Sequence, residues 1–236
     1  MNSLENGDAS MVRNYVSNAD KRRAESRKKI LDAAVDLFFT KGYENTTTRD
    51  IIVKAGILNG SLYNRFKSKD EILYTIFEEA VKDALDQLKG LLEKEKNPVV
   101  VINLPAALEI YMASRNPKVA ELIYQVHRSW NTMQNYIGTY TEWANANLKE
   151  YGISYSDDPM SDIKIMSILG GIGSICGYYA NGGTADYRDI LTNFIGIVCG
   201  LFNVHVFDTA KLIDSICSMM EEGDITIYGH RLNESL

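Results

Sequence analysis

The sequence predicts an all-α protein with an N-terminal helix-turn-helix domain, joined by a long helix to an all-helical C-terminal domain. Apolar residues recur at three- and four-residue spacing along most of the 236 residues, which is the period of an amphipathic helix. Only 4 prolines interrupt the chain, so long helices meet few obstacles. No segment alternates apolar and polar residues between hairpin turns, the pattern that indicates strands.

The composition is that of an ordinary globular protein, with 45% hydrophobic and 24% charged residues. The length suits one large domain or two modest ones, each with a packed core. Cys176, Cys199 and Cys217 cannot all pair with one another and lie in apolar stretches, so we expect free, buried thiols in a reducing compartment. The polar start of the chain predicts no signal peptide and a cytoplasmic protein.

The charge is distributed unevenly along the chain. Residues 1–70 carry 13 Lys and Arg against 9 Asp and Glu, a balance of +4, whereas residues 71–236 carry 12 against 22, a balance of −10. This asymmetry suggests a nucleic-acid-binding module joined to an acidic domain, although charge alone leaves open a basic surface without a partner. Residues 21–23 and 27–29 form two basic triplets, either an arm that follows DNA phosphates or a solvated helix face.

The first elements follow from apolar spacing and capping residues. Residues 1–20 lack a hydrophobic period and are predicted to be disordered. A helix begins at Lys21 and ends at Lys41-Gly42, because glycine suits the left-handed position after a helix. Its apolar face is formed by Ile30, Ala34, Leu37 and Phe38.

Two short helices and a long one come next. Thr47 as N-cap and Asp50 three residues later form a short-armed capping box, and that helix ends at Ala55-Gly56. Another short helix spans about residues 59–66, and we expect Asn59 to cap it. Ser68 and Glu71 then mark the start of a long helix that reaches residue 96. Further helices are predicted near residues 98–114, 117–128, 130–151, 159–181, 185–205 and 208–222.

The two short helices, preceded by a third, form a helix-turn-helix arrangement. Gly56 supplies the residue tolerant of positive φ that the turn needs. Packing of Leu62 and Phe66 inward leaves polar, aromatic and cationic side chains outward, able to bond phosphates and base edges. These outward residues are Asn59, Ser61, Tyr63, Asn64 and Arg65.

A longer stretch resembles the signature of the TetR-type repressor family in order and spacing. It runs from Gly42-Tyr43 through Thr46-Thr47-Thr48-Arg49-Asp50-Ile51 and Ala55-Gly56-Ile57 to Gly60-Ser61-Leu62-Tyr63-Asn64-Arg65-Phe66-Lys67-Ser68-Lys69-Asp70. The resemblance implies a ligand-responsive, homodimeric transcriptional regulator, most simply a repressor, with a DNA-binding domain over residues 21–68 and a helical ligand-binding and dimerisation domain over 69–236. It implies double-stranded operator DNA and a small-molecule effector as partners, and the aromatic-rich middle of the chain suggests that this effector is hydrophobic or aromatic.

The resemblance also assigns DNA contacts to individual residues. It implies phosphate contacts for Thr47, Thr48, Arg49, Tyr63 and Lys69. It implies base-facing positions for Ser61, Asn64 and the start of the second short helix, Asn59 and Gly60, and Arg65 and Lys67 complete the predicted DNA-binding set. Two positions depart from the family pattern: Leu58-Asn59 stands where a serine-lysine pair is common, and Ile52 where alanine is common.

Two long uncharged stretches, residues 165–185 and 190–207, carry glycines at helical spacing. Glycine costs about 1 kcal/mol in a helix interior, so several on one face indicate close helix approach. We predict a four-helix dimer seam that contains Gly170, Gly173, Gly177, Gly196 and Gly200, with packing inside one chain as the alternative. Acidic flanks and interrupting polar residues disfavour a membrane span, and we expect no membrane partner.

The middle of the chain is rich in aromatic residues, which line ligand pockets well. We predict effector contacts from Tyr111, Tyr124, His127, Trp130, Met133, Tyr136, Tyr140, Trp143 and Tyr178. An aromatic stripe at helical spacing is also typical of a plain core, and this alternative stays open. An acidic, aromatic cavity would suit a cationic, planar molecule.

Catalytic and metal-binding patterns find little support in the sequence. His127, His205 and His230 lack metal-ligand spacing, and no two cysteines lie two residues apart. We therefore expect no catalytic residues, metal or cofactor. Two other classes stay open: a helical ligand-binding protein whose helix-turn-helix is a protein-interaction surface, and an unrecognised helical enzyme.

Overall fold

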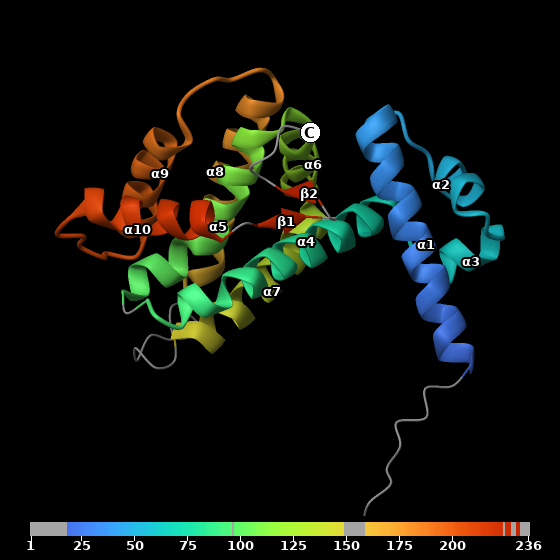
Figure 1. Ribbon diagram of the computed structural model, residues 1–236, viewed down its shortest axis with the longest axis horizontal. Coiled ribbons are helices and arrows are strands. Elements are labelled where there is room, and N and C mark those ends of the chain that lie inside the picture. Colours follow the sequence, from blue (N-terminus) through green and yellow to red (C-terminus); the bar gives the residue numbers. More distant parts are fainter. Residues whose placement is uncertain (1–17, 96, 149–158, 224, 228–229, 232–236) are drawn as a thin grey trace, which may run out of the picture.

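The computed structural model describes residues 18–95, 97–148, 159–223, 225–227 and 230–231. Three helices, α1 (Asn18–Lys41), α2 (Thr48–Ala55) and α3 (Asn59–Tyr63), form one end of the molecule. The long helix α4 (Lys69–Leu92) runs from this end into a larger helical body (Figure 1). The all-α prediction is confirmed, since ten helices account for nearly all of the described secondary structure.

Local signals explain how α1, α2 and α4 begin and end. Gly42 and Gly56 adopt positive φ values of 84° and 62° directly after α1 and α2, as predicted. The capping box at the start of α2 is present: the Thr47 side chain accepts from the Asp50 backbone N–H, and the Asp50 carboxylate accepts from the Thr47 backbone N–H at 2.8 Å. Ser68 likewise accepts from the Glu71 N–H at the start of α4.

The body is built around α5 (Pro98–Arg115), whose middle is almost completely buried. It packs against α4, α6 (Pro117–Arg128), α7 (Trp130–Leu148), α8 (Ser161–Ala180), α9 (Tyr187–Leu201) and α10 (Thr209–Glu222). Asn97 and Asn116 precede Pro98 and Pro117, and each asparagine side chain caps the helix that follows. Each Asn-Pro pair therefore both separates two helices and begins the second of them.

Several predictions needed correction. Asn59 does not cap α3; it is the first helical residue, and Leu58 precedes it without a side-chain cap. The same helix ends at Tyr63 rather than near Phe66, because the chain turns at Asn64 and Arg65. A two-residue antiparallel pair, β1 (Thr226–Ile227) and β2 (His230–Arg231), occurs where no strand was expected. The predicted disorder of residues 1–20 is wrong for residues 18–20, because the first helix begins at Asn18, before the expected Lys21; residues 1–17 lie outside the described residues.

Helix α8 is long and apolar enough to cross a membrane by length and composition, with a mean hydropathy of 1.3 over its most apolar window. In the structure it packs along α6 and α5 within the body, with its buried side chains facing these helices. The three cysteines on α8, α9 and α10 are free and buried, as expected, and burial raises the pKa of each thiol.

Candidate nucleic-acid interface

The helix-turn-helix is held by a small core between α1, α2 and α3. Ile30, Ala34 and Phe38 of α1 meet Ile51 of α2 and Leu62 of α3, all nearly or completely buried. After α2, the Ile57 N–H bonds to the Ile52 carbonyl, which turns the chain at Gly56 into α3. The packing therefore fixes which face of α3 points away from the protein.

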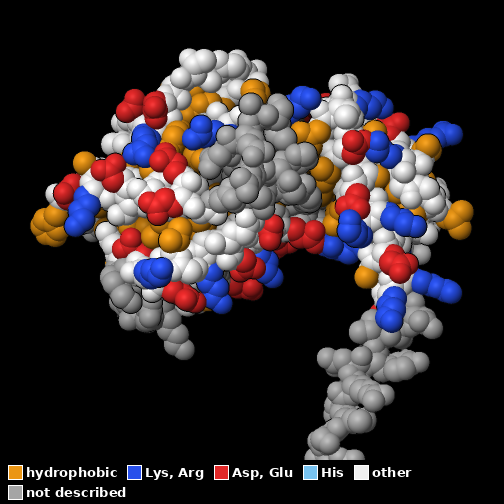
Figure 2. Space-filling model, in the orientation of Figure 1, with side chains coloured by type: hydrophobic (Ala, Val, Ile, Leu, Met, Phe, Trp, Pro, Cys, Tyr) orange, Lys and Arg blue, Asp and Glu red, His pale blue; other side chains and the backbone are white. Residues whose placement is uncertain are grey.

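The outward face of α2 and α3 is polar with one aromatic ring. The Tyr63 side chain is 50% exposed, and its hydroxyl lies 3.2 Å from the Thr48 hydroxyl, so the two helices present these groups together. Ser61 is half-buried at the same surface. The other exposed members of the predicted set are Arg49, Asn59, Gly60, Asn64 and Lys67. Figure 2 shows Lys and Arg side chains spread over this end of the molecule, with a few acidic ones among them.

Besides Thr48 and Tyr63, three predicted DNA contacts have partners within the protein. The Thr47 hydroxyl belongs to the capping box. The Arg65 guanidinium donates to the Ser61 carbonyl at 3.0 Å and to the Arg23 carbonyl at 3.4 Å, which ties α3 to α1. Lys69 is half-buried, and its ammonium donates to the Tyr43 carbonyl at 2.8 Å. The same ammonium lies 4.0 Å from the centre of the Tyr43 ring.

The ring of Tyr43 anchors the loop between α1 and α2 onto α4. Its hydroxyl donates to the Asp70 carboxylate, and burial together with that carboxylate raises its pKa well above the ordinary value. Since Lys69 is held against this ring, it can face DNA only with the part of its ammonium that the protein leaves open.

Leu58 is an exposed apolar residue beside α3 that the predicted DNA-binding set does not include. It is 80% exposed directly before α3, and Val53 on α2 is 73% exposed. Exposed apolar side chains beside a recognition helix can contact thymine methyl groups. The sequence indicated an unusual surface here, because Leu58-Asn59 stands where the family pattern commonly has a serine-lysine pair.

Ion pairs connect the elements of this end. Lys41 of α1 bonds to Asp50 of α2 at 2.8 Å, and the bonds to Lys41 and Thr47 hold the pKa of Asp50 below its ordinary value. Arg27 of α1 bonds to Glu79 of α4 at 2.6 Å. The first ion pair fixes α1 against α2, and the second connects the helix-turn-helix end to the long helix of the body.

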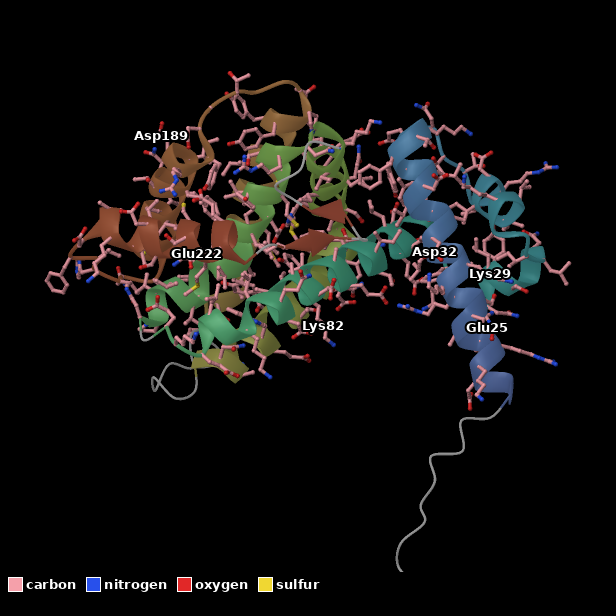
Figure 3. All side chains as sticks on the ribbon, in the orientation of Figure 1. Glu25, Lys29, Asp32, Lys82, Asp189 and Glu222 are labelled. Atoms are coloured by element: carbon pink, nitrogen blue, oxygen red, sulfur yellow. The ribbon has the colours of Figure 1, made fainter. Side chains whose placement is uncertain are left out.

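Figure 3 shows Glu25, Lys29 and Asp32 projecting from α1 and Lys82 from α4.

The predicted effector residues are divided among several surroundings. Tyr136, Tyr140 and Trp143 line a cavity of about 650 Å³ between α4, α5 and α7. Tyr111 is buried against Tyr187 and Arg115. The other side chains are either packed in the body or exposed: Tyr124 and Met133 are half-buried, His127 is buried, and Trp130 and Tyr178 are 58% and 45% exposed.

A buried acid, Glu109 on α5, lies close to this cavity and was not singled out from the sequence. It is fully buried and bonds to His127 Nε2 at 2.6 Å and to the Tyr136 hydroxyl. Burial and the nearby Glu109 raise the pKa of Tyr136 well above its ordinary value. A carboxylate in a core needs such partners, and they come from positions 18 and 27 residues further along the chain.

The glycines predicted for the dimer seam fall into two groups. Gly173 and Gly177 are buried against α6: an added Cβ would meet His127 Cβ at 2.7 Å and the Tyr124 ring at 3.1 Å. These two positions serve packing inside the chain, the alternative stated above, because α6 covers them. Gly170, Gly196 and Gly200 are exposed, with open space beside them.

In the described part of the chain, no three His, Cys, Asp or Glu side chains are grouped as a metal site.

Comparisons with known proteins agree with this geometry. A family model described as bacterial regulatory proteins, tetR family, matches residues 30–75. The HTH-type transcriptional repressor KstR2 of Mycolicibacterium smegmatis is 45% identical over 67 residues, which cover 28% of this chain and 31% of that protein. The match thus spans about a third of that relative's length.

Solved structures share the fold over most of the chain. A putative TetR-family regulator from Syntrophomonas wolfei has a TM-score of 0.53 at 22% identity, covering 78% of this chain and 99% of that chain. RolR, solved in complex with resorcinol, has a TM-score of 0.58 at 19% identity, covering 83% and 95%. The family model and the helix-turn-helix geometry thus show that residues 30–75 are similar to the tetR family of bacterial regulatory proteins, and the solved structures show that the fold of most of the chain is that of TetR-type regulators.

Proposed function

We propose that this protein is a homodimeric, DNA-binding transcriptional repressor that acts in the cytoplasm and leaves a palindromic operator when a small hydrophobic or aromatic effector binds. The observation that carries the proposal is the outward face of α2 and α3. There Tyr63, Thr48 and Asn64 stand exposed or half-exposed on helices whose opposite sides form a rigid core. Such a face offers hydroxyl, amide and aromatic groups to phosphates and base edges.

A dimer is supported by exposed apolar surface on α8 and α9. Gly170, Gly196 and Gly200 leave open space there, and Ile163 and Ile197 are 53% and 63% exposed. Two such helix pairs can approach closely in a four-helix seam with two-fold symmetry. A two-fold dimer places its recognition helices about 34–36 Å apart, in successive major grooves of a palindrome.

Effector release requires that the ligand prefer a dimer whose helix spacing does not fit DNA. Helix α4 suits this role, because it lines the 650 Å³ cavity and also bonds to α1 through Glu79 and Arg27. A tilt of α4 would carry the helix-turn-helix end with it. The resorcinol bound to RolR is consistent with a small aromatic effector.

The test is binding of the purified protein to fluorescent fragments of its own upstream DNA at about 50 and 200 mM salt. We expect tight binding to a palindrome that weakens steeply as salt rises, because phosphate contacts release counterions. Tyr63→Ala should weaken binding across sequences, and Asn64→Ala should change the preference among them. Phe207→Ala, which removes a fully exposed ring from the body, is the matched control and should leave DNA affinity unchanged.

Weak, sequence-independent binding that Tyr63→Ala leaves unchanged would contradict the proposal. That result would favour the other open class, in which the helix-turn-helix is a surface for another protein.

A further inference from the structure

The cavity between α4, α5 and α7 has an aromatic inner wall whose polar tips are already bonded. The Tyr136 hydroxyl donates to the buried Glu109, and the Tyr140 hydroxyl donates to the Ile102 carbonyl at 2.9 Å. Both side chains are nearly buried, and Trp143 lies beside them, 6.2 Å from Tyr140 between ring centroids. The rings therefore offer carbon surface to an occupant rather than free hydroxyl groups.

The rim of the same cavity is acidic. Glu78, Glu79, Asp86 and Glu142 line it, against two cationic side chains, Lys82 and Lys89. The lining thus carries two more negative than positive charges. A volume of about 650 Å³ lies within the range of small-molecule pockets. Aromatic carbon surface beside excess carboxylate charge is the combination that attracts organic cations.

One rim residue also belongs to the contact with the DNA-binding end. The Glu79 carboxylate accepts from the Arg27 guanidinium of α1 at 2.6 Å. Both side chains are more than two-fifths exposed, so this ion pair is weak enough for a competing cation to replace. A positive charge placed in the cavity reduces the attraction between Glu79 and Arg27 and loosens α1 from α4.

We propose that this cavity binds an amphipathic organic cation, and that Glu79 connects its occupancy to the DNA-binding end because the cation and Arg27 compete for one carboxylate. The predicted effect of the cation on DNA affinity rests on the proposed function. The predicted binding of the cation to the cavity does not depend on the proposed function.

Two ions of the same shape and opposite charge test the site. Tetraphenylphosphonium and tetraphenylborate are titrated into the full-length protein by calorimetry and by fluorescence of its two tryptophans, Trp130 and Trp143. We expect the cation to bind at least about tenfold more tightly than the anion. Glu142→Gln should weaken the cation about two- to fivefold, and Glu121→Gln, the same change on α6 outside the cavity, should not. Equal binding of both ions, preference for the anion, or no binding would overturn the proposal.

The coupling is tested by operator affinity with and without saturating tetraphenylphosphonium. The cation should lower the operator affinity of the unmodified protein about two- to fivefold, the range of an exposed ion pair. In Arg27→Gln, most of this roughly two- to fivefold effect of the cation on operator affinity should disappear. The affinity of this variant for the cation should stay equal or rise, because Glu79 no longer pairs with Arg27. If the cation lowered the operator affinity of Arg27→Gln as much as that of the unmodified protein, the role of Glu79 would be refuted. Operator binding without any cation reports on the proposed function separately, so the two failures are distinguishable.

Discussion

Replacement of Gly173 by alanine should destabilise the protein, although alanine is the better helix former. Gly173 lies in the middle of α8, where an added Cβ would stand 2.7 Å from His127 Cβ. Carbon atoms at their best separation are about 3.5–4.0 Å apart. The neighbouring atom is a Cβ attached to the α6 backbone, and the His127 ring is held by Glu109, so no rotation of a flexible side chain relieves the contact.

The size of the effect follows from two opposing terms. Alanine gains about 1 kcal/mol of helix propensity over glycine. Forcing α6 and α8 apart by about 1 Å is overpacking, which costs about 1–3 kcal/mol, and the rigid contact favours the upper end. The net loss in free energy of unfolding is therefore about 2 kcal/mol, which lowers Tm by about 4–8 °C in a chain of this length.

The matched control is Gly138→Ala on α7, where the glycine is exposed and nothing lies within 4 Å of an added Cβ. It should gain up to about 1 kcal/mol. Urea denaturation of both variants at one protein concentration, followed by circular dichroism, measures the difference. If Gly173→Ala were as stable as Gly138→Ala, the close approach of α6 and α8 at Gly173 would be refuted.

Three further outcomes are expected. The pKa of Asp50 is lower in the folded protein than in the unfolded chain, so its contribution to stability is present above the unfolded-state pKa and is lost as the pH falls through the folded-state pKa. Asp50→Asn should therefore make stability depend less on pH in acid unfolding followed by circular dichroism, and an unchanged dependence would contradict this. Burial raises the pKa of Tyr74 to about 12, so stability should fall as pH rises from 10 to 12, and Tyr74→Phe should reduce that fall in Tm; an equal fall in both proteins would count against it. Gly196→Glu places a charge on the proposed dimer seam and should shift the protein to monomer in sedimentation analysis, whereas an intact dimer would place the seam elsewhere.

The helix-turn-helix was predictable because its signals are local. The capping box of Thr47 and Asp50 closes within four residues, and Gly56 is required at its own position by the backbone of the turn. The expected cap by Asn59 was wrong, because residue type alone does not decide whether a side chain lies before a helix or within its first turn. The β1–β2 pair was missed because two-residue strands carry no alternating pattern.

The site in the body was predictable only in kind. Aromatic spacing indicated a face of α7, and the structure places Tyr136, Tyr140 and Trp143 of that face on a cavity. Nothing in the spacing distinguished them from Trp130, which is exposed on the same helix. The buried acid Glu109 was not singled out, because its partners His127 and Tyr136 lie 18 and 27 residues further along the chain.

The sequence by itself determined the helical class, the caps, the turns and the family signature, since each depends on residues a few positions apart. Only the tertiary structure decided which faces meet. Gly170 and Gly173 lie on one helix three residues apart, yet one is open to solvent and the other is pressed against His127. Periodicity defines a face but not its neighbour, and the neighbour is set by how all the helices share one core.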